Sequence, residues 1–189
     1  MSEGLYEMVE SGPVIAAIKD EEGLKKCCEL EEIRVVFILY GDILKIEEIV
    51  KKVKENGKVA IVHVDLLSGL ASKEIAVDFI KRNTVADGII STKPALIRRA
   101  KEIGLYTVMR FFLLDSMAFD SIEKQLSQVR PDFVEVLPGA MPKVIKKLCE
   151  SHKTPIIAGG LISDKEDIMS ALNAGAIAVS STNAKVWGM

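Results

Sequence analysis

Apolar residues along the chain fall into short runs that recur roughly every 20 to 25 residues. The runs are rich in Val, Ile and Ala and show little polar alternation, which is typical of parallel strands covered on both faces. They predict eight strands, over Pro13–Ile18, Arg34–Tyr40, Val59–Leu66, Gly88–Ser91, Tyr106–Leu114, Phe133–Leu137, Pro155–Ala158 and Ala176–Ser180.

The segments between these runs have the period of amphipathic helices. Ile43–Asn56 is the clearest case, because its apolar residues recur at helical spacing and a glycine follows it. Lys93–Ile103 and Asp164–Ala174 are also followed by glycine. We expect Ser163 and Glu166 to form a capping box at the start of the last of these helices.

Strict alternation of strand and helix, with no break in composition, predicts one domain over residues 1–189. The fold class that fits best is α/β, a small TIM-type (β/α)₈ barrel, with a lead-in segment over 1–12 and a tail over 183–189. An open doubly wound sheet is the alternative.

Only Asn183–Met189 follows the eighth strand, so we expect the final helix to be truncated or missing. Either Leu5–Ser11 or a second subunit would then cover the exposed strands, which favours a homodimer. Trp187, the only tryptophan, is expected to pack on that flank or in a subunit contact.

Composition narrows the class of protein further. Hydrophobic residues make up 49% and charged residues 28%, which excludes a disordered chain. The chain has no apolar stretch of about 18 residues and no basic-then-apolar start, so we expect a cytoplasmic protein that makes no membrane contact. Three cysteines without C-x-x-C spacing and two histidines give no grounds for a disulfide framework, a metal site or a bound cofactor.

Charge is uneven although the net charge is −2. Two predicted helices, over 93–104 and 142–153, each carry a net charge of +3. Such faces are usually only solvated, and nucleic-acid-binding proteins show a stronger basic footprint. If RNA binds, we place it on Arg98, Arg99, Lys101, Lys143, Lys146 and Lys147.

Ligands of such barrels bind at the carboxyl ends of the strands. Gly159 and Gly160 follow the seventh strand, and Ser181 and Thr182 end the eighth. Glycine backbone and hydroxyl groups at this position predict a phosphate site, because barrels commonly hold phosphate after strands seven and eight. The alternative is a tight turn followed by a serine cluster that caps it.

Other polar residues end neighbouring strands, and we expect them to contact a ligand or shape the mouth of the barrel. His63 and Asp65 could act as an acid–base pair, contact a polyol, or belong to an internal network. Lys93 and Arg110 could bind an anion, or pair internally with Glu135 or Asp65. No nucleophile elbow is present, so covalent catalysis has no support.

Six motifs together resemble the glycerol uptake operon antiterminator regulatory protein family. The resemblance runs from PVIAAIKD at 13–20 to KVW at 185–187. The motifs are HVDLLSGL from residue 63, DGIISTKPALIRRAK at 87–101, RFFLLDS at 110–116, VEVLPGAMPKVI at 134–145, PIIAGGLI at 155–162 and AGAIAVSSTN at 174–183.

The resemblance implies a cytosolic barrel without catalytic activity that responds to glycerol 3-phosphate and acts on the leader mRNA of glycerol operons as an antiterminator. Gly159, Gly160, Ser181 and Thr182 would hold the phosphate, and the other mouth residues would face the glycerol moiety. The chief alternative is a small phosphosugar or phosphotriose enzyme that uses His63, Asp65 or Glu135 as acid or base. A third is a member that has lost RNA binding and signals through a protein partner.

Overall fold

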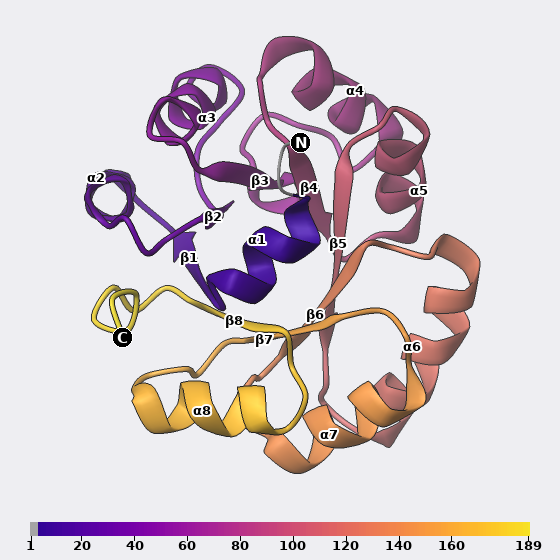
Figure 1. Cartoon of the computed structure of the whole chain (residues 1–189). Helices are drawn as coiled ribbons and strands as arrows, with labels where there is room; N and C mark the ends of the chain where they lie inside the picture. The colour runs from indigo at the N-terminus through magenta and orange to yellow at the C-terminus, as the bar shows by residue number, and fades with distance from the viewer. Residues whose placement is uncertain (1–3) are drawn as a thin grey trace.

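The computed structural model describes residues 4–189 and shows a closed barrel of eight parallel strands, in which each strand pairs with its neighbour in sequence and β8 pairs with β1 (Figure 1). This confirms the predicted TIM-type barrel and rules out the open sheet. The strands are β1 (Val14–Ile18), β2 (Val35–Ile38), β3 (Val59–His63), β4 (Gly88–Ser91), β5 (Tyr106–Phe112), β6 (Phe133–Leu137), β7 (Ile156–Gly159) and β8 (Ala178–Ser181).

Helices alternate with the strands and form a ring around the barrel (Figure 1). A short 3₁₀ turn, η1 (Val64–Leu66), takes up the end of the segment predicted to continue β3. The α-helices are α1 (Leu5–Ser11), α2 (Glu21–Glu29), α3 (Ile46–Glu55), α4 (Glu74–Asn83), α5 (Pro94–Glu102), α6 (Ser116–Val129), α7 (Pro142–Ser151) and α8 (Lys165–Asn173).

Alternation along each strand divides the apolar residues into two cores, because successive side chains point to opposite faces of a strand. One face of every strand packs against the helices and forms the larger core. The other face fills the barrel interior, with Ile15, Phe37, Ile61, Ile90 and Ile157 among its members. Burial on both faces explains why the strands read as nearly continuous apolar runs.

The lead-in segment covers a different surface from the one predicted. Leu5 and Val9 of α1 are buried in the interior cluster together with Ile15 and Val35, so α1 plugs one end of the barrel. Tyr6 stacks on Phe133, with 6.5 Å between ring centroids. Of the two alternatives for covering the exposed flank, the one that used Leu5–Ser11 is therefore wrong.

The chain ends without a helix after β8, as predicted, and the tail itself fills that gap. Its path lies between α2 and α8 (Figure 1). Val186 and Trp187 are buried in the outer core, and Trp187 exposes 2% of its surface. The indole Nε1 of Trp187 donates a hydrogen bond of 2.7 Å to the carbonyl oxygen of Ser181. The tail thus covers part of the barrel surface that a helix after β8 would otherwise cover.

The cap of α8 lies one residue later than predicted. Asp164 is the N-cap and accepts a 2.9 Å hydrogen bond from the backbone N–H of Asp167. Ser163 donates to the Asp167 carboxylate through both its N–H and its hydroxyl. An aspartate caps a helix as well as a serine does, so the Ser163–Glu166 box is wrong.

Within residues 4–189, no helix has the length and apolar character needed to cross a membrane.

Replacing Trp187 by alanine tests the tail's role. We expect the free energy of unfolding to fall by about 3–5 kcal/mol, because the change removes a buried aromatic ring and leaves a cavity. Urea titration followed by circular dichroism measures this. Met189→Ala is the control, since Met189 is 56% exposed and should shift stability by less than about 0.5 kcal/mol. An unchanged midpoint for Trp187→Ala would mean that the tail does not seal the wall.

Candidate functional site

Four polar residues occupy the interior face of the barrel at the carboxyl ends of its strands. His63, Arg110, Glu135 and Ser180 lie on β3, β5, β6 and β8, and none exposes more than 8% of its surface. Each follows by two positions an apolar residue of the interior cluster, so it shares that residue's inward face. Those apolar residues are Ile61, Val108, Phe133 and Ala178.

Arg110 and Glu135 form an ion pair at the centre of this group. They are register partners on adjacent strands, and Arg110 Nε lies 2.5 Å from Glu135 Oε2. The other carboxylate oxygen of Glu135 accepts a hydrogen bond from the hydroxyl of Ser180. A chain of contacts therefore runs across the barrel from β5 through β6 to β8. The predicted alternative of an internal pair between Arg110 and Glu135 is what the structure contains.

The ion pair engages Nε of Arg110 and leaves the two terminal nitrogens of the guanidinium without a protein partner among residues 4–189. The one buried side-chain nitrogen or oxygen without a partner in this part of the chain is His63 Nδ1, so both terminal nitrogens of Arg110 reach solvent. Arg110 is thus held by Glu135 with two N–H₂ groups available at the mouth.

Gly159 makes room for the Glu135 carboxylate. A Cβ atom at this position would lie 2.5 Å from Glu135 Oε1 and 2.7 Å from Ser180 Oγ, so any side chain here would force the Glu135 carboxylate and the Ser180 hydroxyl to move. Gly160 has φ +74° in the left-handed region, where glycine is favoured. Leu161 follows at φ +59° with 74% of its surface exposed, an uncommon conformation for a leucine. Space at Gly159 and backbone conformation at Gly160 therefore explain why glycine occupies these positions, independently of the predicted phosphate contact.

His63 is buried beside the ion pair and is neutral at pH 7. Burial, reinforced by the positive charge of Arg110, lowers the pKa of His63 to about 4. Asp65 acts in the opposite direction but is outweighed. The unpartnered Nδ1 of His63 is therefore a hydrogen-bonding group that a ligand could satisfy.

Asp65 is turned toward the next strand. It lies in η1, and its carboxylate accepts hydrogen bonds from the Ser91 hydroxyl and from the N–H and hydroxyl of Thr92. Burial would raise the pKa of Asp65, but these hydrogen bonds outweigh it and hold the pKa below its usual value. Lys93 Nζ lies 3.7 Å from Asp65 Oδ1 and is 41% exposed. Asp65 therefore fastens the loops after β3 and β4.

Of the two hydroxyl residues predicted to bind phosphate, Ser181 is buried and Thr182 is exposed. The Ser181 hydroxyl donates to the carbonyl oxygen of Ile162 and accepts from the N–H of Asn183, so it holds two loops together. Thr182 lies just after β8 and lines a pocket together with Lys19, Asp20 and Trp187. Sequence reasoning missed Ser180, which a strict two-residue alternation from Ala178 places in the interior.

The basic residues of α5 are largely paired. Arg99 binds the carboxylates of Asp78 and Glu102. Lys101 donates to the carbonyl oxygen of Arg130. Arg98 is exposed and forms no ion pair with the described residues.

The basic residues of α7 differ from one another. Lys146 Nζ is 4.0 Å from Glu150 Oε1. Lys143 and Lys147 are exposed and have no carboxylate partner within residues 4–189. Helix α6 lies between α5 and α7 (Figure 1), so the six basic residues do not form one continuous surface.

The pKa of His63 predicts how stability depends on pH. The unfolded chain takes up a proton near pH 6.5 and the folded protein near pH 4, so this contribution to stability is present above pH 6.5 and is lost as pH falls toward 4. We expect His63→Gln to remove about 2 kcal/mol of the fall in unfolding free energy between pH 7 and pH 5. Urea titrations at each pH measure the difference. His152→Gln is the control, and identical pH profiles for the wild type and His63→Gln would contradict the assignment.

Comparison with known proteins places the chain among relatives of similar length. It is 45% identical over 183 residues to "Uncharacterized protein YgcP" of Escherichia coli (strain K12), covering 97% of this chain and 95% of the relative. The crystal structure of the glycerol uptake operon antiterminator regulatory protein from Listeria monocytogenes superposes with a TM-score of 0.88 at 32% identity, over 92% of this chain and 94% of that one. The related protein TM1436 from Thermotoga maritima gives 0.81 at 36% identity, over 93% and 98%.

The sequence profile described as "Glycerol-3-phosphate responsive antiterminator" matches residues 14–187, which is nearly the whole barrel. The resemblance inferred from the six motifs is confirmed. The chain belongs to the glycerol-3-phosphate responsive antiterminator family.

Proposed function

We propose that this protein is a cytoplasmic sensor of glycerol 3-phosphate that controls antitermination on the leader mRNA of glycerol-utilisation genes. Membership of the family supports the ligand and the regulatory role. The ligand site is the mouth of the barrel, where the phosphate lies toward Gly160 and Thr182 and the glycerol moiety toward His63.

The observation that best supports this proposal is that the two terminal N–H₂ groups of Arg110 are available to a ligand. A guanidinium that is fixed at Nε and free at its terminal nitrogens offers two parallel N–H groups, the geometry that phosphate and carboxylate oxygens accept best. The unpartnered Nδ1 of His63 adds a group suited to a hydroxyl of the ligand. A small anion that carries hydroxyl groups matches both.

The same geometry favours a sensor over an enzyme. Both oxygens of Glu135 are occupied, by Arg110 and by Ser180, and the Asp65 carboxylate is taken by Ser91 and Thr92. A general base needs a pKa near the working pH and an accessible lone pair. His63, with a pKa near 4, is a weak base at pH 7. The candidate acid–base residues are thus suited to holding structure and ligand.

Calorimetric titration tests the ligand. We expect the wild type to bind glycerol 3-phosphate and to respond weakly to glycerol or inorganic phosphate. Arg110→Lys, which keeps the charge but loses the fork, should raise the dissociation constant by about tenfold or more. Ligand at 100 times its dissociation constant should add about 2.7 kcal/mol to the unfolding free energy of the wild type.

Arg82→Lys is the matched control, because Arg82 is exposed on α4, away from the mouth. It should bind as the wild type does. Equal affinity in Arg110→Lys and wild type would remove Arg110 from the site, and a folded wild type that binds no phosphorylated polyol would overturn the ligand assignment.

Phosphorus NMR tests the absence of catalysis. Glycerol 3-phosphate, dihydroxyacetone phosphate and glyceraldehyde 3-phosphate incubated with the protein should keep their spectra, because the two candidate carboxylates, Asp65 and Glu135, are engaged by hydrogen bonds. Conversion of any of them that disappears in His63→Gln would show that the protein is an enzyme.

A further inference from the structure

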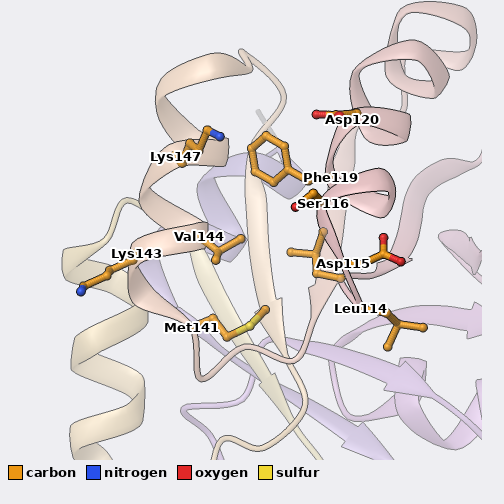
Figure 2. Close-up of a pocket in the computed structure, with 10 residues that line it drawn as sticks. Leu114, Asp115, Ser116, Phe119, Asp120, Met141, Lys143, Val144 and Lys147 are labelled. Carbon is orange, nitrogen blue, oxygen red and sulfur yellow. The ribbon is translucent and has the colours of Figure 1, made fainter.

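A pocket outside the barrel lies between α6 and α7. It has a volume of about 550 Å³ and is lined by residues from 113–120 and 141–147 (Figure 2). We call it the α6–α7 pocket. It opens on the same side of the molecule as the mouth, because its lining includes the loops that follow β5 and β6.

The pocket combines an apolar interior with an aromatic ring. Phe119, Met141 and Val144 line it and are only partly exposed. Leu114, which also lines the pocket just before α6, is 84% exposed and leaves apolar surface uncovered. Exposed apolar surface next to a pocket marks a surface for a partner.

The charges around the pocket are available for binding. Lys147 Nζ lies 4.5 Å from the centroid of the Phe119 ring, and Figure 2 shows it pointing across the pocket toward that ring. Lys143 extends from the same helix away from the pocket (Figure 2). On the opposite wall, the Asp115 carboxylate caps α6 by accepting from the N–H of Ala118. Asp120 has no hydrogen-bonding or ion-pair partner within residues 4–189.

Three of the six basic residues predicted to bind RNA are engaged within residues 4–189, and Arg98 on α5 is not. Arg99, Lys101 and Lys146 are engaged by carboxylates or a carbonyl oxygen of the protein itself. Lys143 and Lys147 have no carboxylate partner within residues 4–189, so their charges can meet an external polyanion without first breaking an ion pair. Lys147 contacts the Phe119 ring and would leave it for a phosphate when a base stacks there. These two lysines both line the pocket from α7, and they fit a strand whose backbone runs along this helix.

We propose that the α6–α7 pocket takes an unstacked base of single-stranded RNA, with the flanking phosphates on Lys143 and Lys147. This assignment rests on the proposed function as a regulator that acts through leader mRNA. Single-stranded RNA is read by splaying a base onto an aromatic ring and by hydrogen bonds to its edge. Phe119 supplies the ring, and the Asp120 carboxylate accepts from an exocyclic amino group, which favours a base that carries one.

The pocket is joined to the ligand site through two loops. Arg110 and Glu135 lie on β5 and β6, whose following loops form part of the pocket wall. The N–H of Leu113 donates a 2.7 Å hydrogen bond to the carbonyl oxygen of Leu137, which ties these loops together. The ligand site and the pocket wall are therefore carried by the same two strands, which is the route from ligand to RNA that we propose.

Fluorescence anisotropy with a labelled single-stranded transcript of the leader, at saturating glycerol 3-phosphate, tests the site. We expect the double variant Lys143→Gln/Lys147→Gln to bind about tenfold or more weakly and to show a log–log salt slope shallower by about 1.4. Phe119→Leu, which keeps an apolar side chain, should weaken binding by about tenfold. The control is Lys146→Gln/Lys153→Gln, which changes the net charge equally but lies outside the pocket lining; it should bind within about twofold of the wild type.

The outcomes separate this inference from the proposed function. If the wild type binds the transcript and the pocket variants bind equally well, the pocket is overturned and the regulatory function stands. If the wild type binds glycerol 3-phosphate but no transcript, both the role in RNA regulation and the assignment of the pocket to RNA are wrong. If pocket variants abolish regulation in cells while the purified wild type has no RNA affinity, the surface belongs to a protein partner and the RNA assignment is wrong.

Discussion

The buried ion pair between Arg110 and Glu135 organises the functional end of this barrel. Taking two charges out of water costs several kcal/mol per ion, so such a pair is weak evidence for stability. Below this polar group the interior is filled with apolar side chains, and the chain adapts to the pair at two further positions. Ser180 hydrogen-bonds to Glu135, and Gly159 leaves space for its carboxylate. What the pair provides is an arginine held in one orientation with its terminal donors at the mouth.

Most of the fold could be predicted from the sequence because burial on both faces leaves a strong signal. A parallel strand such as Val35–Ile38 must be apolar at every position, and the helix over Ile46–Glu55 must be apolar on one face only. The role of the terminal segments could not be predicted. Leu5 and Val9 fill the barrel end while Trp187 covers its flank, and the apolar residues of the two segments do not by themselves indicate which surface each one covers.

The site was only partly predictable, because residues at a strand end can point into the mouth or away from it. Arg110 and Glu135 were expected at the mouth, and their mutual contact was one of two open alternatives. Gly159 was assigned to phosphate from its place in the chain, whereas its space is needed by a carboxylate on another strand. Such contacts join residues far apart in sequence, Ser180 and Glu135 being 45 positions apart, and no local pattern reveals them.

A crystal structure of the protein with glycerol 3-phosphate tests the central claim most directly. The account predicts the ligand at the carboxyl ends of the strands, with oxygen atoms within hydrogen-bond distance of the terminal nitrogens of Arg110 and a hydroxyl group near His63 Nδ1. It also predicts that Arg110 Nε stays on Glu135. A ligand bound elsewhere on the barrel, or at the mouth without contact to Arg110, would contradict the account.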